Sequence, residues 1–149
     1  MAQTRILVVD DDPVVRRTVG FVLDEHGLGP VIAAPDGQEA VRVAMRDRPD
    51  VVVLDLRMPG MDGIAVCRRI RAQASLAHTR IVLLSAELMG REQRILASIG
   101  ADEWIRKPIA PSRMVAVVKE QLARAAELRG AEHETPAEPA VTPPAAGAS

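Results

Sequence analysis

Short apolar runs alternate along the chain with segments of helical spacing, and four of these runs stop on a polar residue. The runs are residues 6–9, 51–54, 81–84 and 104–106, and they are followed by Asp10 and Asp11, Asp55, Ser85 and Lys107 in turn. Continuous apolar runs of about five residues are typical of strands that are buried on both faces of a parallel sheet. In open parallel sheets the functional crevice lies at the carboxyl ends of the strands. The pattern therefore predicts one site that holds three carboxylates, a hydroxyl and an ammonium group.

The segments between the first runs predict helices. Asp12 and Pro13 form a favourable helix start, with Asp12 as the N-cap and Pro13 at the first helical position. This helix is expected to end near residues 26–27. Its expected inward face consists of Val14, Thr18, Phe21, Val22 and Leu23. Asp36 and Glu39 have the spacing of a capping box, which predicts the start of a second helix.

The second half of the chain continues this alternation. After Asp55, a Pro-Gly pair at residues 59–60 marks a loop, and Asp62 is a candidate cap for the next helix. Further helices are expected over 64–73, over 88–99 and from Pro111 onward, and a further strand over 30–34. Strands that alternate with helices of this length predict an α/β fold of the (βα)5 type with a parallel sheet.

The length and a change in composition suggest one domain followed by a tail. The chain has 149 residues, which suffices for one domain with a substantial core. From about Gly130 the chain becomes rich in Ala, Pro and Glu, and residues 131–149 carry no Lys or Arg. Such a segment has too little apolar surface to offset its ordering entropy. We expect the domain to span residues 1–129 and residues 130–149 to be a disordered tail.

The net charge and the cysteine content limit which binding partners and which cellular compartment we expect. The formal net charge of -1 gives no general attraction to nucleic acid or to an anionic membrane, so neither is expected as a partner. No long apolar stretch precedes Asp10, which argues against a signal peptide or a membrane span. Cys67 is the only cysteine, so we expect a reducing compartment, the cytoplasm. Its surroundings look like a helix face, where a free cysteine usually packs as a small hydrophobe.

The acidic residues at the strand ends predict a metal site. If Asp10, Asp11 and Asp55 lie within about 5 Å of one another, each ionised pair costs roughly 3 kcal/mol at an effective dielectric of ~20. Such a cluster either raises a carboxylate pKa or recruits a cation. Mg²⁺ fits, because it accepts carboxylates together with water and phosphate oxygens. Zinc does not fit, since the three histidines are scattered and share no motif spacing.

A carboxylate beside Mg²⁺ can act as a nucleophile toward a phosphoryl group and form an acyl phosphate. The metal and a fixed cation must then neutralise the charge on the transferring oxygens. Lys107 has the character of that cation. Ser85 can donate a hydrogen bond to the phosphoryl product, and the small Ala86 beside it leaves room for the group to enter.

From residue 5 to about residue 125, the chain resembles a receiver domain of the two-component response regulators. The resemblance rests on four strings in order, namely residues 7–11 (LVVDD), 55–63 (DLRMPGMDG), 84–86 (LSA) and 107–108 (KP). Each string is weak alone, but together, each at a strand end, they are a specific signal. The resemblance implies a flavodoxin-like, doubly wound sheet with strand order 2-1-3-4-5.

The resemblance also implies a role for each site residue. Asp55 matches the phosphoacceptor, Asp10 and Asp11 match the acid pair that binds Mg²⁺ together with Asp55, and the backbone carbonyl of Arg57 matches a further metal ligand. Lys107 matches the lysine that contacts the phosphoryl group, and the Lys107–Pro108 peptide matches one that is cis in the family. Ser85 matches the switch hydroxyl, and Trp104 stands at the position of the switch aromatic, where Tyr or Phe is more usual.

We therefore interpret the chain as a single-domain response regulator receiver. The expected phosphoryl donor is a sensor histidine kinase or a histidine phosphotransfer protein, and the output is an unknown downstream protein. Phosphorylation would alter the surface formed by residues 88–99, residues 104–106 and the last helix, and this surface is also an option for a dimer. Because catalysis is shared with the donor, we do not expect the domain to count as an enzyme.

Other function classes remain open. A pseudo-receiver would serve as a protein-interaction scaffold without phosphorylation, although the complete set of site residues argues against it. A Mg²⁺-dependent phosphohydrolase with an aspartyl nucleophile would need a second acid and a substrate cap, and no insertion large enough for a cap is present. A flavin-binding relative lacks aromatic residues in its loops. Arg57 and Glu87 could pair across the site and hinder hydrolysis of the phosphoryl group, or they could be two independent exposed charges.

Overall fold

Five parallel strands form a single sheet in the order β2-β1-β3-β4-β5. The computed structural model describes residues 5–86 and 92–134 of the chain. The strands are β1 (Ile6–Val9), β2 (Val31–Ala34), β3 (Val51–Asp55), β4 (Arg80–Ser85) and β5 (Glu103–Arg106). In the register, Val9 pairs with Leu54 across β1 and β3, and Asp55 pairs with Leu84 across β3 and β4. The predicted (βα)5 fold and its strand order are therefore confirmed.

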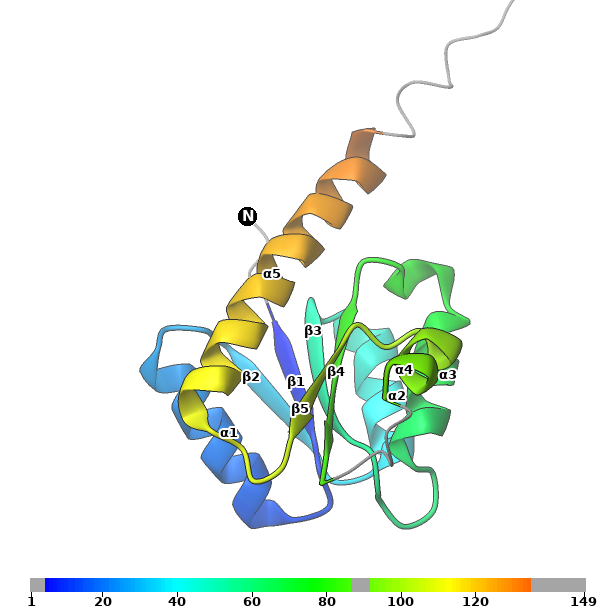
Figure 1. Ribbon diagram of the computed structural model, residues 1–149. Helices are drawn as coiled ribbons and strands as arrows, with labels where there is room; N and C mark the ends of the chain where they lie inside the picture. Colours follow the sequence, from blue (N-terminus) through cyan, green and yellow to red (C-terminus); the bar gives the residue numbers. More distant parts are fainter. Residues whose placement is uncertain (1–4, 87–91, 135–149) are drawn as a thin grey trace, which may run out of the picture.

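Helices cover both faces of the sheet (Figure 1). They are α1 (Pro13–Glu25), α2 (Gly37–Asp47), α3 (Gly63–Arg71), α4 (Glu92–Ile99) and α5 (Pro111–Glu134), with a short 3-10 turn η1 at Ala74–Leu76. Two aliphatic cores result. One lies between the sheet and the side of α2, α3 and α4, and the other between the sheet and the side of α1 and α5. Within the described residues, no helix combines the length and the apolar character that a membrane crossing requires.

The predicted helix caps are present. The Asp12 carboxylate accepts the N–H of Val14 at 2.9 Å, and Pro13 stands at the start of α1. Asp36 and Asp62 cap α2 and α3 in the same way. Each cap fixes the point at which the chain leaves a strand end and enters a helix, so it also fixes the loops at this edge of the sheet.

The predicted inward face of α1 is wrong in part. Val14 and Phe21 were expected to point inward, but each is 64% exposed, and Thr18 is exposed as well. Leu23 is buried as predicted, and the face that packs on the sheet also carries Val19, which was not predicted. Neighbouring positions on a helix lie about 100° apart, and both stripes are apolar, so the spacing alone could not choose between them. As a result α1 presents an apolar outer stripe.

The last helix extends into the segment that was predicted to be a disordered tail. α5 runs through Gly130 to Glu134, so the first five residues of the predicted tail are helical. The guanidinium of Arg129 pairs with Asp50 and donates to the carbonyl of Arg48 at 3.0 Å, which holds this part of α5 against the loop before β3. Ala and Glu around Gly130 also favour a helix over the break that a glycine suggests. Residues 135–149 of the predicted tail lie outside the described residues.

Candidate functional site

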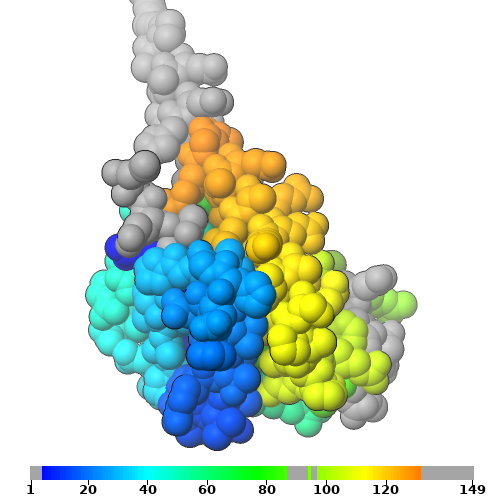
Figure 2. Space-filling view, turned by 90° about the vertical axis from the view of Figure 1, so that its left-hand side faces the viewer, coloured from blue at the N-terminus to red at the C-terminus, as the bar shows by residue number. Residues whose placement is uncertain are grey.

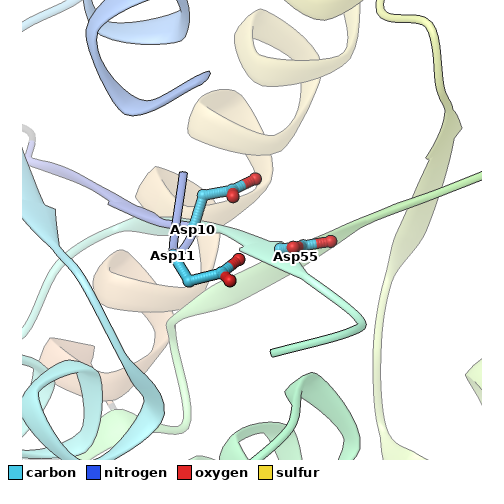
Figure 3. Close-up of side chains that lie close together, drawn as sticks. All are labelled: Asp10, Asp11 and Asp55. Atoms are coloured by element: carbon cyan, nitrogen blue, oxygen red, sulfur yellow. The ribbon is translucent and has the colours of Figure 1, made fainter. Parts of the chain in front are cut away.

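Three carboxylates converge at the carboxyl edge of the sheet (Figure 3). Asp10 and Asp11 follow β1, Asp55 ends β3, and one ligand oxygen from each lies within 4.8 Å of the others. Asp10 and Asp55 are only 1% and 5% exposed, whereas Asp11 is exposed to solvent. The sequence prediction that these three residues share one site is borne out by their positions.

The two oxygens of the Asp10 carboxylate have different surroundings. Oδ1 accepts the backbone N–H of Asp12 at 2.9 Å. Oδ2 is buried and has no hydrogen-bond partner among the described residues. Burial raises the pKa of Asp10, and repulsion from Asp55 and Asp11 adds to the increase, although the Asp12 N–H and Lys107 oppose it. Buried oxygens of this kind are costly unless a donor or a cation meets them.

Lys107 is the cation that faces this cluster. Its Nζ lies 3.2 Å from Asp55 Oδ1, with which it forms a hydrogen bond, and 3.5 Å from Asp10 Oδ2. Burial alone would lower the pKa of Lys107, but the charges of Asp55 and Asp10 outweigh it, so the pKa is raised and the ammonium stays charged. The Lys107–Pro108 peptide is cis, as the resemblance implied. One ammonium against three carboxylates leaves the site with an excess of negative charge.

Ser85 and Trp104 lie on the two neighbouring strands. Ser85 ends β4, is buried, and accepts the backbone N–H of Lys107 at 2.9 Å through its own carbonyl, which ties the ends of β4 and β5 together. Trp104 pairs with Leu83 in the sheet and packs against the core on the side of α2, α3 and α4. Its indole N–H is buried without a hydrogen-bond partner among the described residues. The sheet thus brings Ser85 to the site edge and leaves Trp104 two register positions below it.

The loop that follows Asp55, the candidate phosphoacceptor, packs closely against the end of β3. The N–H of Gly63 donates to the carbonyl of Leu56 at 2.9 Å. A Cβ on Gly63 would lie 2.5 Å from the carbonyl oxygen of Asp55, so only glycine permits this approach. Arg57 is exposed in this loop, and its proposed role through the carbonyl stays a prediction. Glu87, its suggested partner, lies outside the described residues.

Two residues at the site were missed from the sequence. Gly63 was seen only as part of a motif, although a glycine directly after a capping aspartate was a signal of close packing. Arg16 was not considered, yet its Nη1 donates to the backbone carbonyl of Asp10 at 2.7 Å. Helical side chains lean toward the N-terminus of the helix, so a long cation at the fourth position of α1 was a signal that it reaches back to the strand end.

The donor set suits a hard divalent cation. Carboxylate oxygens are the ligands that Mg²⁺ prefers, and it usually takes one or two of them together with water and phosphate oxygens. Oδ2 of buried Asp10 accepts no hydrogen bond from the described residues and has the Lys107 ammonium only at 3.5 Å, so a bound cation would satisfy it. Asp10, Asp11 and Asp55 therefore fit Mg²⁺, and the cluster contains no nitrogen or sulfur ligand that would favour zinc.

Similar solved structures are receiver domains. The chemotaxis protein CheY4 of Vibrio cholerae has a TM-score of 0.75 and 30% identity, and the match covers 80% of this chain and 98% of that one. The receiver domain of the sensor histidine kinase PA1611 of Pseudomonas aeruginosa has a TM-score of 0.73 and 31% identity, over 82% and 99% of the two chains. The latter structure holds a magnesium ion in its active-site cleft.

Similar curated proteins are regulators of transcription. The transcriptional regulatory protein CseB of Streptomyces coelicolor is 34% identical over 122 residues, which are 82% of this chain and 50% of that protein. The DNA-binding response regulator MtrA of Mycolicibacterium smegmatis is 39% identical over 120 residues, or 80% and 51%. The chain thus spans about half the length of these relatives. The family model of the response regulator receiver domain matches residues 6–119, and the chain belongs to this family of phosphorylation-dependent signalling domains.

Proposed function

We propose that this domain accepts a phosphoryl group on Asp55 from a phosphohistidine donor with the help of Mg²⁺. The observation that carries the proposal is the surplus of carboxylates at the carboxyl edge of the sheet, with the Lys107 ammonium on Asp55 Oδ1. The alternative is a pseudo-receiver that binds partners without phosphorylation. A scaffold has no need for three converging carboxylates, two of which share the Lys107 ammonium, so the site favours phosphorylation.

Each of the site residues has a defined part in this reaction. An oxygen of the Asp55 carboxylate attacks phosphorus, the bond from phosphorus to the donor imidazole nitrogen breaks, and an acyl phosphate forms on Asp55. Asp10, Asp11 and Asp55, together with the carbonyl of Arg57, would hold Mg²⁺, which supplies charge neutralisation for the phosphoryl oxygens. Lys107 supplies a second, fixed positive charge at the same oxygens. Since the donor provides the leaving group and part of the catalysis, the domain itself is not an enzyme.

The outer stripe of α1 supplies a docking surface for the donor protein. Val14 and Phe21 are each 64% exposed on the helix that begins directly after the acidic cluster. Between α1 and α5 lies an apolar hollow of about 200 Å³, whose lining includes Val15, Ile109 and Met114. Figure 2 views this face, with α1 and α5 side by side. A histidine kinase or histidine phosphotransfer protein that covers this surface would bring its phosphohistidine to Asp55.

Phosphorylation would be read out on the opposite flank of the site. In our proposal Ser85 moves toward the phosphoryl oxygens, and Trp104 shifts into the space that is vacated. The buried indole N–H of Trp104 has no hydrogen-bond partner among residues 5–86 and 92–134, so another conformation could gain a hydrogen bond there. The face of α4, β5 and α5 would then bind an unknown downstream protein or a second copy of the domain.

Phosphorylation can be tested by mass spectrometry of the intact protein. The full chain is incubated with Mg²⁺ and a small acyl phosphate or amidophosphate. We expect the wild type to gain one phosphoryl group and Asp55→Asn to gain none. Asp50→Asn is the matched control, because Asp50 is also a buried aspartate beside β3 but lies at the other edge of the sheet. If neither small donors nor a histidine kinase phosphorylate the wild type, the pseudo-receiver becomes the better description.

The lifetime of the acyl phosphate tests the role of Arg57. If Arg57 and Glu87 pair across the site and hinder the attacking water, Arg57→Ala shortens this lifetime. An unchanged lifetime would leave Arg57 as an independent exposed charge. The lifetime is measured by the decay of the phosphorylated mass after removal of the donor.

A further inference from the structure

The side chain of Arg16 makes a contact that the proposed reaction has not used. Its Nη1 donates to the backbone carbonyl of Asp10 at 2.7 Å, and the guanidinium is partly buried. Arg16 is the fourth residue of α1, and side chains on a helix lean toward its N-terminus. The arginine therefore reaches back over the loop that connects β1 to α1, to the backbone of Asp10, the first acid of the metal site.

This contact completes a set of three hydrogen bonds that fix Asp10. The N–H of Asp10 donates to the carbonyl of Ala34 at 3.3 Å, on the neighbouring strand β2. Its Oδ1 accepts the N–H of Asp12 at 2.9 Å, and its carbonyl accepts the guanidinium of Arg16. Both ends of the residue and its side chain are thereby held, and Oδ2 remains directed at the cluster, 3.5 Å from Lys107.

The same contact determines where Asp11 points. A peptide unit is planar, so the carbonyl of Asp10 and the nitrogen of Asp11 turn together. Asp11 is exposed, and packing around its side chain contributes little to its position. Its carboxylate reaches the shared site because the backbone that carries it is oriented. The hydrogen bond from Arg16 to the carbonyl of Asp10 orients that backbone directly.

We propose that Arg16 is a positioning residue that orients the peptide between Asp10 and Asp11, so that both carboxylates meet Asp55 on one divalent cation. The inference rests on the proposed Mg²⁺-dependent function. It predicts the direction in which the Mg²⁺ affinity changes when Arg16 is removed, because the positive charge of Arg16 and its positioning role have opposite effects on that affinity. The positive charge alone disfavours a cation at the site, whereas the orientation of the two acids favours it.

Arg17 is a matched control for the charge. It is the next residue on α1, carries the same charge and is exposed, and it lies outside the acidic cluster. Removal of Arg17 takes one positive charge from the same region of the surface without touching the carbonyl of Asp10. Solvent and salt screen an exposed charge of this kind strongly.

The experiment is a Mg²⁺ titration of the full chain by calorimetry, with the fluorescence of Trp104 as a second signal. We expect Arg16→Ala to weaken Mg²⁺ binding by about tenfold, as is typical when a group that orients metal ligands is lost. Arg17→Ala is expected to leave the affinity unchanged or make it slightly tighter. Arg16→Lys, which retains the charge and one donor, is expected to recover part of the loss.

A second readout separates positioning from a general loss of structure. With a small phosphoryl donor, the rate of phosphorylation of Arg16→Ala is expected to approach that of the wild type at saturating Mg²⁺. If Arg16→Ala binds Mg²⁺ as tightly as the wild type or more tightly, the inference is overturned while the proposed function stands. If Arg16→Ala does not fold, Arg16→Met decides, because methionine keeps much of the side-chain length but has no donor for the Asp10 carbonyl, and an affinity equal to that of the wild type would overturn the inference. If the wild type itself binds no Mg²⁺, the proposed function fails first.

Discussion

Buried aspartates lie at both edges of the sheet, and the two edges differ in how fully the protein pairs their carboxylates. At the amino edge, Asp50 precedes β3 and accepts the backbone N–H of Arg5 at 3.0 Å as well as the guanidinium of Arg129. At the carboxyl edge, Asp10 and Asp55 share the single ammonium of Lys107 with each other. The aspartates at one edge are fully paired, whereas those at the other carry uncompensated charge.

Asp102 follows the rule of the amino edge. It precedes β5, and its carboxylate pairs with Arg71 at 2.8 Å and Arg80 at 2.9 Å and also accepts the N–H of Ile81 at 2.8 Å. Asp102 is partly buried, and its carboxylate is paired by two or three donors of the protein, so it contributes to stability. A buried carboxylate without such donors keeps a negative charge that a bound cation can neutralise. The comparison separates acids that hold the fold from acids that perform chemistry, although the residue type is the same.

The largest expected effect on stability is at Asp50. Asp50→Asn should lower the free energy of unfolding by about 2 kcal/mol, because a buried, charge-assisted pair with Arg129 is lost and an amide donor faces the N–H of Arg5. The measurement is unfolding in urea. Phosphorylation of Asp55 should persist in this variant under native conditions. Loss of both properties together would contradict the separation of the two edges.

A smaller loss is expected at Asp102. Asp102→Asn should cost about 1 to 2 kcal/mol, since its two arginine partners are partly exposed and solvent screens the charges. Urea unfolding again provides the value. Arg71→Lys is a useful companion, because lysine keeps the charge but cannot also serve the carbonyl of Gly100, to which Arg71 Nε donates at 2.7 Å. A gain in stability for Asp102→Asn would show that its partners do not compensate its burial.

At the carboxyl edge, replacing a buried aspartate by asparagine should raise the stability instead of lowering it. Without Mg²⁺, Asp10→Asn should raise the stability by about 1 kcal/mol, because it removes a buried charge that is repelled by Asp55 and Asp11. The raised pKa of folded Asp10 means that its ionised form weakens the folded state at neutral pH. This penalty disappears as the pH falls through the raised pKa. The advantage of Asp10→Asn should therefore be largest near pH 7 and vanish below the ordinary pKa of aspartate, as thermal unfolding at several pH values would reveal.

The smallest effect on stability is expected on the outer stripe of α1. Phe21→Ala should change the free energy of unfolding by less than about 0.5 kcal/mol, because the side chain is 64% exposed. It should slow phosphorylation by a histidine kinase or a histidine phosphotransfer protein, but not by a small phosphoryl donor. Met45→Ala, at an exposed methionine on α2, is the control. Equal rates with the protein donor in both variants would remove α1 as the docking surface.

Much of the fold and of the acidic cluster could be predicted from the sequence. Apolar runs that end on Asp10, Asp55 and Ser85 define parallel strands with a common edge, and the chemistry at their ends follows from that topology. Caps such as Asp12 act on residues two or three positions away, so a local pattern identifies them. Such features depend on short-range sequence or on a regular repeat.

The remainder depends on contacts between distant segments. The pair of Arg129 with Asp50 spans 79 positions, and no local sequence pattern near either residue predicts it. This pair also holds α5 in place where the helix continues past residue 129, the predicted end of the domain. The inward face of α1 was wrong at Val14, Thr18 and Phe21 because both Val14 and Val15 are apolar, and only packing in the folded protein decides which one is covered. Arg16 was missed because its partner is a backbone carbonyl, which a sequence motif does not display.

The most direct test of the account is the effect of Mg²⁺ on thermal unfolding of the wild type, Asp10→Asn and Asp50→Asn. A ligand that binds only the folded state raises its stability according to its concentration and affinity. We predict that Mg²⁺ raises the melting temperature of the wild type and of Asp50→Asn by similar amounts, from a lower starting point in the latter, and that it has little effect on Asp10→Asn. An equal increase in Asp10→Asn, or no increase in the wild type, would contradict the claim that the surplus acids at the carboxyl edge form a metal-binding site.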